Sequence, residues 1–270
     1  MAWLTIGMIL WLANGEDVEL IAHRGESYDA PENTMAAFRL AWEKKDRAIE
    51  LDVRLTRDGK LVVGHDADTK RLAGTKRVIK ESTLEELRSL DAGRFMGPRW
   101  AGEKMPTLDE ALATIPEGAR CFIEIKVGPE AIPALVESVR RSGKRPEQLA
   151  IISFRADAVA EAKRRLPEIP AYFLSSFHLD TVTGAWQPSI DVLIDQAREI
   201  GADGLDLSWK GPLDRESARR IKAAGLGLYV WTVDDPDEAR RLIEAGVDGI
   251  TTNKPTWLRE RLANEPAASR

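Results

Sequence analysis

Residues 48–53 read Ala-Ile-Glu-Leu-Asp-Val, and residues 122–126 read Phe-Ile-Glu-Ile-Lys. In a β-strand, alternate side chains point to the same face, so each stretch has an apolar face and a charged face. The charged members are Glu50, Asp52, Glu124 and Lys126. We expect the apolar residues to face covering helices and the charged ones to face the mouth of a barrel. The opposite arrangement, with an outward charged stripe, is less favoured because two strands share the pattern.

Short apolar runs recur along the whole chain. The predicted strands are 18–22, 48–53, 120–126, 149–154, 171–174, 202–207, 226–231 and 248–251. Amphipathic stretches separate most of them, and the predicted helices are 33–44, 84–90, 108–113, 131–141, 156–165, 191–199, 215–224 and 236–245. Repeated strand–helix alternation indicates parallel strands with right-handed crossovers. Eight such units predict an α/β protein with a closed (β/α)8 TIM barrel rather than an open doubly wound sheet.

One segment departs from this alternation after the second predicted strand. Residues 56–59 read Thr-Arg-Asp-Gly, and Asp-Gly is a hairpin signal. A short extra strand over 61–64 then ends at His65. We expect the chain up to about Met105 to form a small insertion at the mouth of the barrel, where such excursions build active sites.

Length and composition limit the class of protein. The chain has 270 residues with 43% hydrophobic residues, which suits one barrel of about 250 residues. A formal net charge of −5 gives no electrostatic reason to expect nucleic-acid binding. Because Cys121 is the single cysteine, an internal disulfide and cysteine-rich metal sites are excluded. We predict one domain over 16–262 and a tail over 263–270, and the sequence does not indicate the oligomeric state.

The beginning of the chain is apolar. Residues 2–13 form a run that is shorter than the roughly 20 residues a membrane-spanning helix needs, so no stable membrane span is expected. The run has the length of a signal-peptide core, and small residues follow it, although no Lys or Arg precedes it. Residues 1–15 are therefore interpreted as a signal peptide or an N-terminal cap, and export is favoured over a cytoplasmic location.

The inward carboxylates predict a metal site. Glu50 and Asp52 would repel each other in a partly dry place, and a divalent cation relieves that repulsion. With Glu124 they form an oxygen-rich set, which suits Mg²⁺ or Ca²⁺. Zinc or manganese with a histidine ligand is the alternative.

Two of the three histidines stand at strand ends beside charged residues. His23 precedes Arg24, and His65 precedes Asp66. Histidine is the side chain best suited to proton transfer near neutral pH, so both are candidate acid–base residues. His178 has no comparable setting and is interpreted as a loop residue near the mouth.

Cationic and aromatic side chains near the same strand ends suggest an anionic ligand. The guanidinium of Arg24 matches phosphate oxygens, and Lys126 adds a point charge. Trp231 ends a predicted strand where it could stack on a substrate, with core packing as the alternative. Thr34 is expected to cap the helix that follows it.

Taken in order, the motifs from about residue 20 to residue 255 resemble the glycerophosphodiester phosphodiesterase family. The matching stretches are His23-Arg24-Gly25, Pro31-Glu32-Asn33-Thr34, Glu50-Leu51-Asp52-Val53, Asp58-Gly59, Val63-Gly64-His65-Asp66, Pro106-Thr107-Leu108, Ile123-Glu124-Ile125-Lys126, Val230-Trp231-Thr232-Val233 and residues 246–252.

This resemblance implies a metal-dependent phosphodiesterase that acts on a small-molecule phosphodiester. It implies that His23 and His65 are the acid–base pair. The implied metal ligands are Glu50, Asp52 and Glu124, and the implied substrate-binding residues are Arg24, Lys126 and Trp231. The cofactor would be Mg²⁺ or Ca²⁺, and the products would be glycerol 3-phosphate and an alcohol.

Two departures from the family pattern and two alternatives accompany this interpretation. The family often has an aspartate at the position of Asn253, which we expect to affect the loop more than the chemistry, and residues 175–200 match poorly. A lysophospholipase D-like or sphingomyelinase D-like enzyme would be favoured by an apolar mouth lined by the loop over 95–100. A non-catalytic phospho-ligand-binding barrel is the second alternative, and it has no need of an acid–base pair.

Overall fold

The computed structural model describes residues 18–264. The predicted signal peptide or cap at 1–15 lies outside the described residues, as does most of the predicted tail at 263–270. The division of the chain into these parts therefore stays a prediction. No helix within 18–264 is long and apolar enough to cross a membrane.

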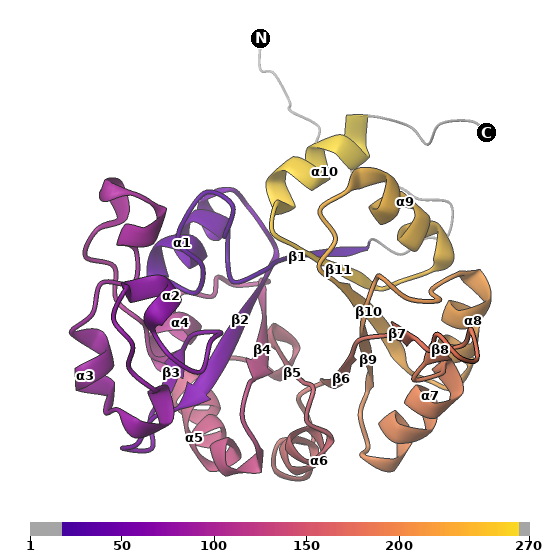
Figure 1. Ribbon diagram of the computed structural model, residues 1–270, viewed down its shortest axis with the longest axis horizontal. Helices are drawn as coiled ribbons and strands as arrows, with labels where there is room; N and C mark the ends of the chain where they lie inside the picture. The colour runs from indigo at the N-terminus through magenta and orange to yellow at the C-terminus, as the bar shows by residue number, and fades with distance from the viewer. Residues whose placement is uncertain (1–17, 265–270) are drawn as a thin grey trace.

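The fold is a closed barrel of parallel strands, as the alternation predicts (Figure 1). The sheet order is β1-β11-β10-β9-β6-β5-β4-β2, and pairing of β1 with β2 closes the ring. The barrel strands are β1 (Glu19–Ala22), β2 (Ala48–Leu55), β4 (Arg120–Ile125), β5 (Leu149–Ser153), β6 (Ala171–Ser175), β9 (Gly204–Ser208), β10 (Gly227–Trp231) and β11 (Gly249–Thr252).

Helices pack around the outside of this ring (Figure 1). They are α1 (Met35–Glu43), α2 (Lys70–Ala73), α3 (Leu84–Arg88), α4 (Leu108–Ala113), α5 (Ile132–Ser142), α6 (Ala156–Arg165), α7 (Ile190–Glu199), α8 (Arg215–Ala223), α9 (Pro236–Ala245) and α10 (Pro255–Asn264). Thr34 caps α1 as predicted, because its side chain accepts a hydrogen bond from the Ala37 amide. Helix α10 was not among the predicted helices.

The predicted insertion lies between β2 and β4. Strand β3 (Leu61–Val63) runs antiparallel to β2 after the predicted hairpin, with Gly59 at φ 72° in the turn. Helices α2 and α3 and several short 3₁₀ turns complete the insertion before α4. Because β3 ends directly before Gly64 and His65, the hairpin delivers that histidine to the mouth of the barrel.

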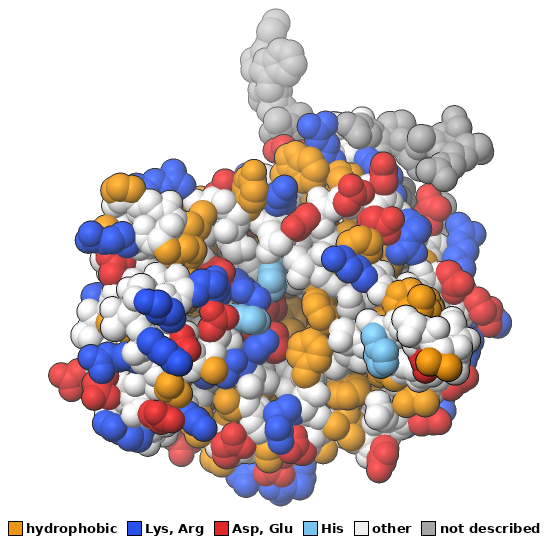
Figure 2. Space-filling model, viewed as in Figure 1, with side chains coloured by type: hydrophobic (Ala, Val, Ile, Leu, Met, Phe, Trp, Pro, Cys, Tyr) orange, Lys and Arg blue, Asp and Glu red, His pale blue; other side chains and the backbone are white. Residues whose placement is uncertain are grey.

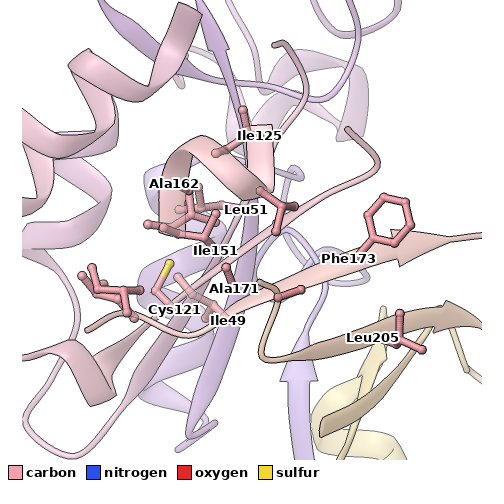
Figure 3. Packing of buried hydrophobic residues seen from close by; sticks show 14 of the residues in the cluster. Ile49, Leu51, Cys121, Ile125, Ile151, Ala162, Ala171, Phe173 and Leu205 are labelled. Atoms are coloured by element: carbon pink, nitrogen blue, oxygen red, sulfur yellow. The ribbon is translucent and has the colours of Figure 1, made fainter. Parts of the chain in front are cut away.

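Apolar residues pack in two layers, as the strand parity predicts. Between strands and helices lies a large cluster that includes Ile49, Leu51 and Cys121 (Figure 3). Inside the ring lies a smaller cluster: Ile21, Ala48, Phe122, Ala150, Ile152, Tyr172, Leu174 and Tyr229. The alternative with Ile and Leu of β2 filling the barrel is therefore wrong, since those side chains face the helices.

An ion pair closes the end of the barrel at which the strands begin. Arg120 contacts the carboxylate of Glu19 at 3.1 Å and donates hydrogen bonds to the hydroxyls of Tyr172 and Tyr229. Its guanidinium also lies 4.7 Å from the ring centroid of Phe122. This end is filled by side chains, so a ligand must enter from the opposite end.

A second hairpin, β7 (His178–Leu179) with β8 (Trp186–Gln187), lies within the poorly matching segment. Each strand has two residues, which is too short for alternation to be visible in the sequence. His178 belongs to this exposed hairpin rather than to a loop.

Candidate active site

A cavity of about 110 Å³ opens at the carboxyl ends of the barrel strands. Figure 2 shows this face: a central hollow is bordered by histidine and charged side chains on one side and by hydrophobic side chains on the other. The lining residues are His23, Arg24, Glu50, His65, Glu124, Lys126, Ile152, Phe154, Leu174, Asp206, Trp231, Thr232 and Thr251. In barrels of this kind, the active site lies at this end.

Three carboxylates meet at one side of the cavity. Glu50 and Asp52 project inward from β2, and Glu124 projects from the neighbouring β4, where it pairs in register with Asp52. One oxygen from each lies within 4.8 Å of the others, and all three residues are largely buried. The three carboxylates that strand alternation predicted to face inward therefore lie close together in the structure.

Burial, mutual repulsion and neighbouring cations give these three carboxylates different pKa values. Burial and the charges of Asp52 and Glu124 raise the pKa of Glu50 well above its usual value. Burial and the charge of Asp52 raise the pKa of Glu124 to about 7. Burial acts in the same direction on Asp52, but the charges of Arg24 and Lys126 outweigh it and hold that pKa below its usual value.

The donor set fits a hard divalent cation. Oε1 of Glu50 and Oδ1 of Asp52 are buried and accept no hydrogen bond from the described residues. An unpartnered buried carboxylate oxygen is costly, and a cation bound between these oxygens removes that cost. Carboxylate oxygens are the ligands that Mg²⁺ and Ca²⁺ prefer. Glu50, Asp52 and Glu124 could therefore hold such an ion.

The loop after β1 adopts an unusual backbone to reach the carboxylates. Arg24 and Asn33 have φ values of 57° and 58°, a region that non-glycine residues rarely occupy. The Arg24 amide donates to Oε2 of Glu50 at 3.0 Å. Nδ2 of Asn33 donates to Oδ2 of Asp52 at 2.7 Å, and Oδ1 of Asn33 accepts a hydrogen bond from the Asp52 backbone amide at 3.2 Å. Both residues thus fix the orientation of a carboxylate.

His23 follows β1 and is held by Asn253. Its Nδ1 donates to Oδ1 of Asn253 at 2.6 Å. The orientation of that amide is set by Asp234, which accepts from its Nδ2 at 2.7 Å. Burial and the charge of Arg24 lower the pKa of His23 to about 4. At neutral pH the imidazole is therefore uncharged, and its unprotonated Nε2 lies 3.9 Å from Oε2 of Glu50.

His65 has a different partner. Its Nδ1 lies 2.8 Å from Oδ1 of Asp66, whose pKa is lowered to about 2 by hydrogen bonds from Arg71 and from His65 itself. Burial lowers the pKa of His65, while the charge of Asp52 and the hydrogen bond to Asp66 oppose that shift. A carboxylate partner stabilises the imidazolium form, which a neutral amide partner does not.

Two cations complete the charged side of the cavity. Arg24 lies between Asp52 at 3.2 Å and Glu32 at 2.8 Å. Lys126 contacts Glu124 at 2.7 Å and Asp52 at 3.6 Å. Both cations remain lining residues of the cavity, so they could also contact an anion bound there.

The opposite side of the cavity is mainly apolar. Trp231, at the end of β10, meets Phe154 edge-on with ring centroids 5.4 Å apart. Ile152 and Leu174 lie among the lining residues on this side. The indole N–H of Trp231 donates to the backbone oxygen of Asp206 at 3.1 Å. Trp231 thus lines the cavity rather than packing only in the core.

The structure brings most of the predicted site residues to this cavity. Asp52 belongs to the carboxylate cluster but does not line the cavity, and the other seven do: His23, Arg24, Glu50, His65, Glu124, Lys126 and Trp231. His178 does not line the cavity, and neither does the loop over 95–100 that was expected at an apolar mouth.

Sequence reasoning missed several residues of the site. Asn253 was expected to affect a loop, yet its side chain contacts His23. Asn33 was assigned to the start of a helix, and Asp66 was noted only as a neighbour of His65. Asp206 on β9 was not considered, although the parity rule that selected Glu50 applies equally to its strand.

A family model described as "Glycerophosphoryl diester phosphodiesterase family" matches residues 23–256 of the chain. The glycerophosphodiester phosphodiesterase of Caldanaerobacter subterraneus subsp. tengcongensis is 36% identical over 245 residues, which cover 88% of this chain and 95% of that protein. The glycerophosphodiester phosphodiesterase of Bacillus subtilis strain 168 is 30% identical, over 90% of this chain and 86% of that protein.

Solved structures show the same similarity. A phosphodiesterase from Oleispira antarctica, in complex with the product sn-glycerol-3-phosphate, superposes with a TM-score of 0.81 at 30% identity, covering 91% of this chain and 97% of that one. The glycerophosphodiester phosphodiesterase of Thermotoga maritima superposes with a TM-score of 0.72 at 29% identity, covering 91% and 98%.

Proposed function

The chain belongs to the glycerophosphoryl diester phosphodiesterase family, and we propose that it hydrolyses glycerophosphodiesters to glycerol 3-phosphate and an alcohol. The observation that carries this proposal is the joint placement of two imidazoles beside the carboxylate cluster of one cavity. Each imidazole is anchored through Nδ1, so each presents Nε2 for proton transfer. The product named for the Oleispira antarctica relative supports the same reaction.

Glu50, Asp52 and Glu124 would hold the divalent cation, Mg²⁺ or Ca²⁺. When bound, this ion supplies positive charge for the phosphoryl oxygens, on which negative charge grows in the transition state. Arg24 and Lys126 add fixed positive charge at the same side of the cavity. Because both are already oriented by Asp52 and its neighbours, they bind the phosphate without reorganising.

His23 acts as the general base. Its Nε2 accepts the proton of the attacking hydroxyl as the new P–O bond forms. If that hydroxyl belongs to water, loss of the alcohol gives glycerol 3-phosphate directly. If it is the 2-hydroxyl of the glycerol, loss of the alcohol gives a cyclic phosphate, which a water molecule then opens to glycerol 3-phosphate. A pKa lowered to about 4 keeps this nitrogen unprotonated at neutral pH. The neutral amide of Asn253 holds the ring without stabilising its charged form.

His65 acts as the general acid. It donates its Nε2 proton to the alcohol oxygen as the P–O bond to the alcohol breaks. Asp66 favours the imidazolium that this role needs, and the negative charge of a bound phosphodiester acts in the same direction. The different partners of the two Nδ1 atoms thus support opposite roles for the two histidines.

A substrate panel tests this function. We expect glycerophosphocholine, glycerophosphoethanolamine and glycerophosphoglycerol each to release glycerol 3-phosphate, measured with a coupled dehydrogenase. Chelation by EDTA should lower the rate by about 10³-fold, and added Mg²⁺ or Ca²⁺ should restore it. Choline release from lysophosphatidylcholine without release of glycerol 3-phosphate would favour the lipid phosphodiesterase instead. Full activity after thorough removal of metal would refute the carboxylate site, and binding without turnover would refute the enzyme.

A further inference from the structure

One carboxylate in the cavity plays no part in the mechanism above. Asp206 projects inward from β9 and is 1% exposed, yet it lines the same cavity as the carboxylate cluster. Its Oδ1 accepts no hydrogen bond from any of residues 18–264, and its side chain forms no ion pair with them. The indole N–H of Trp231 donates to the backbone oxygen of Asp206 rather than to its side chain.

Two other acids at this end of the barrel are partnered by cations. Asp52 lies beside Arg24 and Lys126, and Glu124 lies beside Lys126. Asp206 instead shares its side of the cavity with apolar side chains, including Leu174, to which it is paired in register. A buried polar group without a partner costs folding free energy. A group that persists at that cost in a cavity is expected to find its partner in a ligand.

The position of Asp206 indicates which part of the substrate reaches it. In the ring of strands, β9 stands directly across from β2, so Asp206 faces the cavity from the side opposite Glu50 and Asp52. Asp206 is level with Tyr229, whereas Trp231 is level with Ser208, one inward-facing layer nearer the mouth. A ligand group that contacts Asp206 must therefore lie deep in the cavity and away from the phosphate-binding cations.

The glycerol moiety meets these conditions better than the alcohol does. The alcohol varies among glycerophosphodiesters and must leave after the reaction, so it is best placed toward the mouth. The glycerol has three carbons, which suits a cavity of about 110 Å³. Its 2-hydroxyl lies close to the phosphorus, whereas its terminal hydroxyl is the donor that extends farthest from the phosphate.

Resting on the proposed function, we propose that the Asp206 carboxyl recognises glycerol by hydrogen bonding to its terminal hydroxyl, with Trp231 and Phe154 bordering the glycerol carbons. This makes Asp206 a specificity residue rather than a catalytic one. Burial and the charge of Glu124 raise the pKa of Asp206 well above its usual value. A hydroxyl suits either charge state, because it donates to a carboxylate and accepts from a carboxylic acid. A cationic headgroup would suit only the ionised form.

A substrate pair that differs only in this hydroxyl tests the proposal. We would measure kcat/KM for glycerophosphocholine and for 2-hydroxypropyl phosphocholine, which lacks the terminal hydroxyl and keeps the 2-hydroxyl. We expect the wild-type enzyme to favour glycerophosphocholine by about 10- to 100-fold. In Asp206→Leu this preference should fall to within about threefold, and Asp206→Asn, whose amide can still hydrogen bond, should keep part of it.

Glu19→Gln is the matched control, because Glu19 is a barrel-interior acid at the closed end, and it should keep the wild-type preference. Equal wild-type rates on the two substrates would overturn the proposal whether or not any variant folds. An equal loss of kcat/KM on both substrates in Asp206→Leu would also overturn it. A loss of kcat/KM on glycerophosphocholine but not on glycerophosphoglycerol, whose headgroup is uncharged, would assign Asp206 to a cationic alcohol and overturn it as well. If the wild-type enzyme hydrolyses none of these compounds, the proposed function itself has failed.

Discussion

The two sides of the cavity differ in whether their buried carboxylates have cationic partners. On the side of β1, β2 and β4, several acids and bases lie together, and each cation is shared between carboxylates, as Lys126 is between Glu124 and Asp52. On the side of β5, β6, β9 and β10, hydrophobic side chains surround a single acid, Asp206, which has no cation beside it in the described part of the chain.

This difference separates chemistry from recognition. The charged side carries two anchored imidazoles and a carboxylate set that fits a cation, so it can stabilise charge and move protons. Among the described residues that line the apolar side, Asp206 is the only acid, and no histidine lies there. Removing a group from the charged side should therefore lower the rate for every substrate, whereas changes on the apolar side should alter which substrate is preferred.

The largest effect should come from the two histidines. We expect His23→Ala and His65→Ala each to lower kcat by about 10³-fold, because each removes one proton transfer from the transition state. The loss should be similar for glycerophosphocholine and glycerophosphoglycerol. Steady-state kinetics on both substrates would measure it.

His178→Ala is the control for these variants, since His178 lies on the exposed hairpin β7–β8 and does not line the cavity. We expect it to keep the wild-type kcat. A kcat near the wild-type value in His23→Ala or His65→Ala would contradict the acid–base assignment. A loss confined to one headgroup would contradict the division of the cavity into a chemical side and a recognition side.

A smaller effect should distinguish the two histidines from each other. Asp66→Asn replaces the carboxylate partner of His65 by an amide, so that His65 comes to resemble His23. Loss of the carboxylate should lower the pKa of His65. Because the general acid must be protonated, the basic limb of the kcat/KM profile should move to lower pH by about one unit. The pH–rate profile measures this shift.

Asp68→Asn is a matched control in the same loop, because Asp68 bonds to the Lys70 amide and not to a histidine. Its profile should coincide with that of the wild-type enzyme. If Asp66→Asn instead moves the acidic limb and leaves the basic limb in place, His65 is the base, and the roles proposed for the two histidines must be exchanged.

The barrel and its charged side were both predictable from the sequence. Eight apolar runs separated by amphipathic stretches predict the ring of strands, and alternation in β2 and β4 predicts that Glu50, Asp52 and Glu124 face inward. These inferences succeed because strand parity is a local property that neighbouring residues report. The hairpin that carries His65 was predictable for the same reason, since Asp58-Gly59 marks its turn.

The remaining parts of the site depend on contacts between distant segments. Asn253 meets His23 across 230 residues of chain, and nothing near either residue indicates that contact. Asn33 stands at the start of the predicted helix over 33–44, and nothing near it in the sequence indicates its contact with Asp52. Asp206 was missed for another reason: one acid in an apolar strand shows no pair pattern, whereas Glu50 and Asp52 do.

The smallest effect should appear in stability rather than in activity. Because the pKa of Asp206 is raised in the folded protein, Asp206 keeps its proton there at a pH where the unfolded chain has released it. The free energy of unfolding therefore falls as pH rises from the unfolded-state pKa to the folded-state pKa. Asp206→Asn removes this penalty and should raise Tm by about 3 °C at pH 8. The gain should shrink toward pH 4, where Asp206 is protonated in the folded state and half protonated in the unfolded one.

Thermal unfolding at both pH values measures this gain in Tm. Glu19→Gln is the comparison, because removing the partner of Arg120 should lower Tm. An Asp206→Asn variant that is less stable than the wild-type protein at pH 8 would mean that the carboxylate has a stabilising partner within the protein, and the apolar side would then have no unpaired acid to offer a substrate.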